Sequence, residues 1–153
     1  MGVTNRPKSN EYRLKGYQDA LEAAGLAFDP DLYFSSPEIK EHAKQGEAGL
    51  QSLRAAGATA VFCYNDMTAI GMLAACHKFG LTVPDDLSVI GFDDIDMAVY
   101  TTPPLTTIRQ PRFELGRRAM QMMLDLLDGE TPENQILPGE LVVRQTTARK
   151  IIQ

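Results

Sequence analysis

Two short apolar runs, each followed at once by polar residues, restrict the fold of this chain more than any other feature of its sequence. They are residues 59–64 (TAVFCY) and 87–92 (LSVIGF). A strand exposed on one face alternates apolar and polar residues, whereas a nearly continuous apolar run predicts a strand covered on both faces. Strands of that kind belong to parallel sheets, in which helices make the connections. The two runs therefore predict an α/β fold.

Segments with helical spacing of apolar residues lie around these runs. The first ends at Gly25, and glycine suits the left-handed turn that closes many helices. Residues 35–38 (SSPE) have the composition of a helix start, because serine caps free amides and proline fits the first turn. Strands that alternate with helices predict βαβ units and a doubly wound parallel sheet. The expected elements are a helix over 12–24, an extended piece over 31–34, a helix from 35–38 to 57, a strand over 59–64, a helix over 65–80, strands over 87–92 and 105–108, a helix over 113–127 and a strand near 141–143.

Length and charge exclude several classes of protein. The chain has 153 residues, of which 44% are hydrophobic and 23% charged, an ordinary balance for a soluble domain. Its formal net charge is -5 and no Lys/Arg cluster stands out, so it is a poor DNA binder by itself. No apolar run approaches the roughly 20 residues that span a bilayer, and residues 1–6 lack an apolar signal stretch. We expect a cytoplasmic protein without membrane contact, in which Cys63 and Cys76 stay reduced.

Catalytic interpretations find little support in the sequence. It contains no G-x-S-x-G elbow, phosphate-binding loop or G-x-G-x-x-G motif. Asp93–Asp94 suggests a metal site or a phospho-accepting aspartate, but a metal needs more converging carboxylates than lie nearby. A receiver-type domain would carry a lysine where Arg109–Gln110 stands. His42 and His77 lack metal-ligand companions at suitable spacing and are expected at the surface. We therefore expect no catalytic residue, no metal and no cofactor.

Polar side chains gather where the predicted strands end. In a parallel sheet, ligands bind beyond the carboxyl ends of the strands, which selects residues 64–66, 92–94 and 109–110. Together with Arg13 these segments supply a cation, carboxylates and amides, a set that suits the hydroxyl groups of a sugar-like ligand. The aromatic rings of Phe34, Phe92 or Tyr100 are candidates to cover the apolar face of such a ring.

Each of these polar residues also has a purely structural interpretation. Asp66 is better explained as a helix cap than as a ligand contact. For Asn65, loop hydrogen bonding and ligand contact are balanced, and a ligand role for Asp93 is favoured only modestly. Arg13 on a helix face is, from its position alone, an ordinary solvated charge.

Five collinear motifs resemble the lactose/galactose repressor (LacI/GalR) family. They cover nearly the whole chain in the order and spacing of that family, which makes the resemblance specific. The motifs are residues 13–17 (RLKGY) with 20–21 and Gly25, 60–71 (AVFCYNDMTAIG), 80–94 (GLTVPDDLSVIGFDD), 104–111 (PLTTIRQP) and 115–119 (LGRRA).

The resemblance implies a periplasmic-binding-protein-like type I fold, here mainly one lobe plus crossover segments, with a small effector bound in the cleft between two lobes. By motif position Arg13 resembles the family's effector-clamping arginine, and Asn65 its asparagine at a strand end. Asp93 resembles its hydroxyl-accepting aspartate, and Gln110 its cleft residue near the crossover. Phe34 falls near an aromatic residue of the family that stacks on the effector.

The resemblance also implies an organisation in three parts. Residues 1–110 correspond to the C-terminal lobe, residues 111–134 to a crossover helix that belongs to the absent N-terminal lobe, and residues 135–153 to a returning strand and tail. Family members bind DNA through an N-terminal helix-turn-helix, absent here, and typically act as homodimers. We expect the apolar face of the crossover helix to lack its native cover, so that the chain self-associates or lies against another chain through this helix. The alternative is an exported sugar-binding protein of a transporter, which shares the two-lobed fold.

Overall fold

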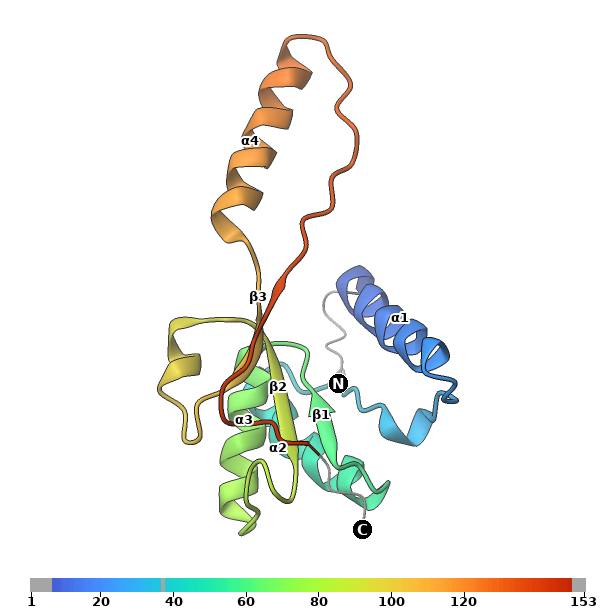
Figure 1. The fold of residues 1–153 in the computed structure, drawn as a ribbon, viewed down its shortest axis with the longest axis vertical. Helices are drawn as coiled ribbons and strands as arrows, with labels where there is room; N and C mark the ends of the chain where they lie inside the picture. The colour runs from blue at the N-terminus through green and yellow to red at the C-terminus, as the bar shows by residue number, and fades with distance from the viewer. Residues whose placement is uncertain (1–6, 37, 150–153) are drawn as a thin grey trace.

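The computed structural model describes residues 7–36 and 38–149. It is a mixed α/β structure, as predicted, and its described strands form a four-stranded sheet in the order β1-β2-β3-β4 (Figure 1). Strands β1, β2 and β3 are parallel, and β4 is antiparallel to β3. The elements are α1 (Pro7–Ala23), the 3-10 helix η1 (Pro30–Leu32), α2 (His42–Ala55), β1 (Ala60–Phe62), α3 (Asp66–Lys78), β2 (Ser88–Asp93), the 3-10 helix η2 (Asp96–Val99), β3 (Thr106–Arg109), α4 (Arg112–Leu127) and β4 (Glu140–Val142).

Helices α2 and α3 pack tightly against each other and supply most of the hydrophobic core. Leu50 of α2 and Met72 of α3 are fully buried there, together with Val89 of β2. A Cβ atom on Gly71 would lie only 2.0 Å from the backbone oxygen of Ala43, so the two helix backbones are in direct contact. Glycine is therefore required at this crossing because any side chain would separate the helices.

One face of the sheet is open, which contradicts the prediction that the apolar strands are covered on both faces. Val61 and Val89 are buried on the side of α2 and α3, but Phe62 on the other side is 38% exposed. Helix α1 stands apart from the layer that α2, α3 and the sheet form (Figure 1). It reaches this side at Arg13, whose guanidinium lies 4.2 Å from the ring centre of Phe92. The apolar runs predict strands covered on both faces, but within this chain helices α2 and α3 cover only one face of the sheet.

The helix start predicted at residues 35–38 is wrong. Helix α2 begins at His42, and Glu41 at its N-cap makes no side-chain capping bond. The hydroxyl of Ser36 donates to Glu38 at 2.9 Å instead of capping a helix. The side chain of buried Gln45 donates to the backbone oxygens of residues 36 and 39, which holds the preceding segment as a loop. Pro37 lies outside the described residues.

The extended piece predicted over 31–34 is also partly wrong. The 3-10 helix η1 takes its first half, and the carboxylate of Asp29 caps it by accepting a bond from the backbone N–H of Asp31 at 2.9 Å. By contrast, the helix end at Gly25 is confirmed, because this residue has the left-handed φ of 70°.

Beyond β3 the chain leaves the body of the molecule. Helix α4 and the segment 128–139 form an arm that projects away from the other helices, and β4 returns the chain to the sheet beside β3 (Figure 1). Among the residues that the structure describes, α4 contains none that is buried. The helix predicted over 113–127 is thus confirmed, with its apolar side chains uncovered.

Candidate ligand-binding site

The structure brings together the polar ends of β2 and β3. The side-chain amide of Gln110 donates to Asp93 Oδ1 at 2.5 Å. The parallel register pairs Asp93 with Arg109, so Gln110 lies just past the end of the ladder. This is the arrangement expected of carboxyl ends of neighbouring parallel strands.

Arg13 of α1 is held at this edge between two aromatic rings. Its guanidinium carbon lies 4.4 Å from the ring centre of Tyr64 and 4.2 Å from that of Phe92. Within residues 7–36 and 38–149, its Nε and Nη1 atoms are buried and have no hydrogen-bond partner. Contact with the two rings positions the guanidinium, and the N–H groups of these two nitrogens have no protein partner among the described residues.

The carboxyl group of Asp93 has an environment that suits hydrogen bonding to a neutral ligand. Burial raises the pKa of Asp93 above its ordinary value, and the hydrogen bond from Gln110 offsets only part of this effect. The positive charge of Arg13 also favours the ionised form. Ligand hydroxyls that donate to this carboxylate would supply the hydrogen bonds that half-burial removes.

Asp93 and Asp94 share an unusual backbone conformation. Their φ angles are 119° and 51°, both in the region that favours glycine. Two successive residues of this kind are costly and persist only where surrounding contacts hold them. The turn aims the two side chains at different partners: Asp93 at Gln110, and Asp94 at Arg109 and Arg144.

Asn65, not Asp66, caps helix α3, so the predicted cap at Asp66 is wrong. The side-chain oxygen of Asn65 accepts a bond from the backbone N–H of Thr68 at 2.9 Å. Its side-chain NH₂ group can still donate to a ligand. Asp66 is fully buried and accepts bonds from the hydroxyl of Thr107 at 2.5 Å and the backbone N–H of Ile95 at 2.8 Å. Asp66 therefore ties α3, β3 and the turn after β2 together.

Phe34 and Tyr100 do not join the residues around Arg13. Phe34 is partly buried and packs against the hydrophobic core. Tyr100 follows η2 and is largely exposed, beside Asp94 and Arg109. Of the aromatic rings proposed as a cover for a ligand, Phe92 is the one that the structure brings to Arg13.

Tyr64 and His42 contribute more to this region than their sequence positions indicate. The hydroxyl of Tyr64 hydrogen-bonds to Ser9 at 2.9 Å, which links the end of β1 to α1. The ring of His42 stacks on Tyr64 with centres 6.1 Å apart, and its Nδ1 atom is buried. The predicted surface position is therefore confirmed for His77 but only in part for His42, which is partly buried. The place of Tyr64 at a strand end was the available signal for its role.

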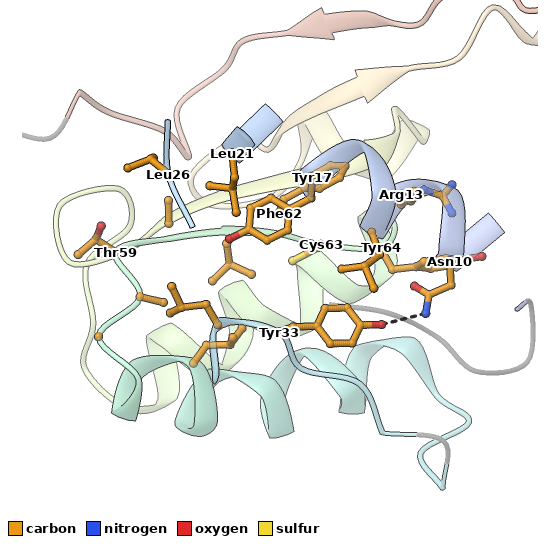
Figure 2. A pocket seen from close by; sticks show the side chains of 17 residues that line it. Asn10, Arg13, Tyr17, Leu21, Leu26, Tyr33, Thr59, Phe62, Cys63 and Tyr64 are labelled. Atoms are coloured by element: carbon orange, nitrogen blue, oxygen red, sulfur yellow. Dashed lines mark hydrogen bonds between the residues drawn. The ribbon is translucent and has the colours of Figure 1, made fainter. Parts of the chain in front are cut away.

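A cavity of about 500 Å³ lies between α1 and β1 (Figure 2). Its walls are mainly apolar and include Leu14, Tyr17 and Leu21 of α1. At the end where Arg13 and Tyr64 lie, the side-chain amide of Asn10 donates to the hydroxyl of Tyr33 at 3.0 Å (Figure 2). Asp93 and Gln110 do not line this cavity in the described part of the chain. The candidate site is therefore the polar cluster at its Arg13 end.

Metal ligation and thiol chemistry have little basis here. Over the described residues there is no cluster of three or more His, Cys, Asp or Glu side chains that could hold a metal ion. Cys63 and Cys76 are buried free thiols, and burial raises the pKa of Cys63 to about 12. A thiol with that pKa is not a nucleophile at neutral pH. No described helix is long and apolar enough to cross a membrane.

Comparisons with known proteins identify the family and the fold of this chain. Residues 1–147 match the family described as periplasmic binding protein-like domain. The HTH-type transcriptional repressor CytR of Escherichia coli K12 is 41% identical over 140 residues, which are 89% of this chain and 40% of that protein. This chain thus spans about two fifths of the length of the curated relatives it matches.

Solved structures give the same result. The transcription regulator CcpA of Lactococcus lactis is 33% identical, with a TM-score of 0.80 over 91% of this chain and 51% of that one. A LacI family transcriptional regulator from Enterococcus faecium, solved with bound ribose, is 33% identical, with a TM-score of 0.75 over 95% of this chain and 55% of that one.

Proposed function

This chain belongs to the LacI/GalR family of regulators, and on that premise we propose that it is the effector-sensing part of a DNA-binding transcriptional repressor. The curated relatives carry the names of transcriptional repressors, which favours this function over an exported transport protein or an enzyme. In this proposal the whole protein acts in the cytoplasm and binds DNA through a separate helix-turn-helix segment. The effector is a small sugar-like molecule.

The observation that carries the proposal is Arg13, stacked between two rings with two buried and unpartnered donors. The nearby carboxylate of Asp93 accepts hydrogen bonds, and Gln110 and Asn65 supply amide donors. A polyol both donates and accepts through each hydroxyl, so it can satisfy the cation and the carboxylate together. The exposed part of the Phe92 ring offers an apolar surface to the C–H groups of a sugar ring.

In this proposal, effector binding regulates the repressor by changing how its two lobes are arranged relative to each other. The effector must bind one arrangement better than the other, and typical allosteric coupling is about 1–3 kcal/mol. Asp93 and Gln110 already bond to each other, and Gln110 stands in the crossover between β3 and α4. An effector hydroxyl that takes over this bond would therefore change how the crossover is held.

The division into lobes follows from the same proposal. Residues 1–110 make one lobe, and the crossover helix within 111–134 packs on the other lobe before residues 135–153 return. The relatives are more than twice as long as this chain, which leaves room for that lobe. The exposed apolar side chains of α4 are consistent with such cover. The family's usual assembly, a homodimer, completes the proposal.

A ligand screen on the full-length regulator tests this function. Ribose, cellobiose and purine and pyrimidine nucleosides are added separately, and the melting temperature is measured. A compound that binds only the native state stabilises it by about 2.7 kcal/mol at a hundred times its Kd. The compound that raises the melting temperature should also change operator binding.

Asp93→Ala should then remove the effector response and leave operator binding intact. Asp96→Ala is the matched control, since Asp96 is an exposed aspartate three residues away. An unchanged response in Asp93→Ala would exclude Asp93 from the site. A full-length protein that binds no operator DNA would reject the proposed function.

A further inference from the structure

A narrow neck joins the arm to the body of the molecule. We define the neck as residues 109–112, which lead from β3 into α4, and residues 140–144, which return through β4 (Figure 1). Every movement of α4 relative to the body must pass through these two stretches. The contacts that hold the neck are therefore the ones that transmit or resist such movement.

One residue of the body, Asp94, bonds to three arginines of the neck. Arg109 Nε lies 2.6 Å from Asp94 Oδ2, and Arg144 Nη2 lies 2.7 Å from Asp94 Oδ1. Arg112 Nη2 donates to the backbone oxygen of Asp94 at 2.6 Å. Both outgoing and returning stretches are thus attached to a single aspartate.

The environment of Asp94 strengthens its bond to Arg144 beyond that of an ordinary surface ion pair, whereas the Arg109 side chain is 48% exposed and its bond is more open to water. The side chain of Asp94 is 9% exposed and that of Arg144 is 14% exposed. Burial alone would raise the pKa of Asp94, but the hydrogen bonds from Arg144 and Arg109 outweigh this effect and lower it. Charge-assisted bonds that are shielded from water are the stronger class of hydrogen bond.

The same turn also places the candidate ligand-binding site. Asp93 bonds to Gln110 while Asp94 bonds to Arg109, so two adjacent residues hold two adjacent residues of the neighbouring strand end. The backbone N–H of the next residue, Ile95, is held by buried Asp66 at 2.8 Å. The left-handed turn is therefore attached to the neighbouring strand end through both carboxylates and to buried Asp66 through the next backbone N–H.

We propose that Asp94 is a positioning residue for the ligand-binding site: by fastening Arg109 it holds Gln110 against Asp93. The inference rests on the proposed function in taking Asp93 and Gln110 as site residues. It adds that the fastening lies outside the site, in a residue that need not touch the effector. Loss of Asp94 then frees Gln110 even though Asp93 and Gln110 are both intact.

Solution NMR of this chain, without effector or DNA, tests the proposal. The readouts are the chemical shifts and the water-exchange rates of the Gln110 side-chain amide protons. Asp93→Ala removes the acceptor oxygen altogether and gives the signal of a released Gln110. Asp94→Asn should move the Gln110 signals towards that position and speed their exchange by about tenfold or more, the scale expected when a charge-assisted bond is lost. Asp94→Glu, which keeps the charge, should restore part of the protection.

Asp96→Asn is the control, because it removes a nearby exposed aspartate and should leave the Gln110 signals unchanged. The proposal is overturned if Asp94→Asn lowers the melting temperature but leaves the Gln110 signals as they are in the original chain, because Asp94 would then only stabilise the fold. Neither outcome depends on effector or operator binding, so this test and that of the proposed function fail separately.

Discussion

Helices α2 and α4 have similar lengths and both carry apolar residues at helical spacing, yet they end up in opposite environments. Helix α2 buries Leu50 and Leu53 against α3. Helix α4 leaves Phe113, Met123 and Leu127 exposed along the arm. The difference shows that an amphipathic pattern predicts an apolar helix face but does not show which element packs against it. In the body, the apolar face of α2 is covered by α3, whereas no described element covers the apolar face of α4 in the arm.

The neck resembles the body and not the arm in this comparison, because hydrogen bonds attach it to buried parts of the structure. Its arginines are fixed by Asp94, and Arg144 also donates to the backbone oxygen of Leu105 at 2.7 Å. Thr146, just beyond it, is fully buried and bonds to Val89 and Thr106. The returning chain is therefore firmly held up to the point where the arm begins.

The largest effect is expected from a core truncation in the body. Met72→Ala should lower the free energy of unfolding by about 2–5 kcal/mol, because Met72 is fully buried and leaves a cavity. Leu124→Ala in α4 is the control, and since Leu124 is 43% exposed it should cost well under about 1 kcal/mol. Urea unfolding measures both. If both variants lost the same free energy of unfolding, the distinction between body and arm would be contradicted.

Two glycine substitutions, one in the body and one in the arm, test the same difference between these two regions. Gly71→Ala places a methyl group against the backbone of Ala43 and should destabilise by about 1–3 kcal/mol. Gly116→Ala in α4 meets nothing within 4 Å and should stabilise by about 0.5–1 kcal/mol, since alanine is the better helix former. Opposite signs in thermal unfolding are expected. A stabilising Gly71→Ala would mean that α2 and α3 can separate freely.

The two adjacent aspartates should have opposite effects on stability at neutral pH. Asp94→Asn removes a carboxylate whose pKa is lowered, and it should destabilise by about 1 kcal/mol after allowance for the half-exposed Arg109. Asp93→Asn removes a carboxylate whose pKa is raised by burial, and it should be neutral or slightly stabilising.

Their pH dependences differ in sign as well. A lowered pKa means that Asp94 stabilises the fold above its ordinary value of 3.8, and this contribution is lost as the pH falls towards the lowered pKa. A raised pKa means that ionised Asp93 destabilises the fold at neutral pH, and this cost disappears as the pH falls through its raised pKa and below 3.8. Unfolding curves of the two variants and the original chain, measured from pH 7 to pH 3, should therefore converge at low pH. If the differences in unfolding free energy between the variants and the original chain stayed constant from pH 7 to pH 3, the two pKa shifts would be contradicted.

The smallest effect on stability is expected at the exposed face of α4, where association is the readout. Leu127→Lys should change the free energy of unfolding by less than about 0.5 kcal/mol. It should nevertheless weaken self-association in sedimentation velocity at high concentration, because it interrupts the uncovered apolar surface. Gln51→Lys on the exposed face of α2 adds the same charge and is the surface control without that consequence. A strictly monomeric original chain would exclude α4 as an association surface.

The order of helices and strands followed from local pattern, and so did the edge of the sheet that carries the polar groups. The runs at 59–64 and 87–92 became β1 and β2 because short apolar runs between helices have few other solutions. Arg13, Asn65, Asp93 and Gln110 were selected because strand ends and family motifs place them there. The bond between Asp93 and Gln110 agrees with that selection, while Phe34 packs against the core.

Tertiary contacts decided what each of the paired polar residues does. Composition alone could not assign the cap to Asn65 and the buried bonds to Asp66, since both residue types cap helices. The choice depends on Thr107, which is 41 residues away in sequence. In the same way, Asp94 is a fastening point because Arg144, 50 residues away, comes back to meet it. The sequence by itself determined the order of the main helices and strands, which depends on spacing within a few residues. The start of α2 and the roles of Asp66, Asp93 and Asp94 depend on side chains that only the folded chain brings within hydrogen-bond distance.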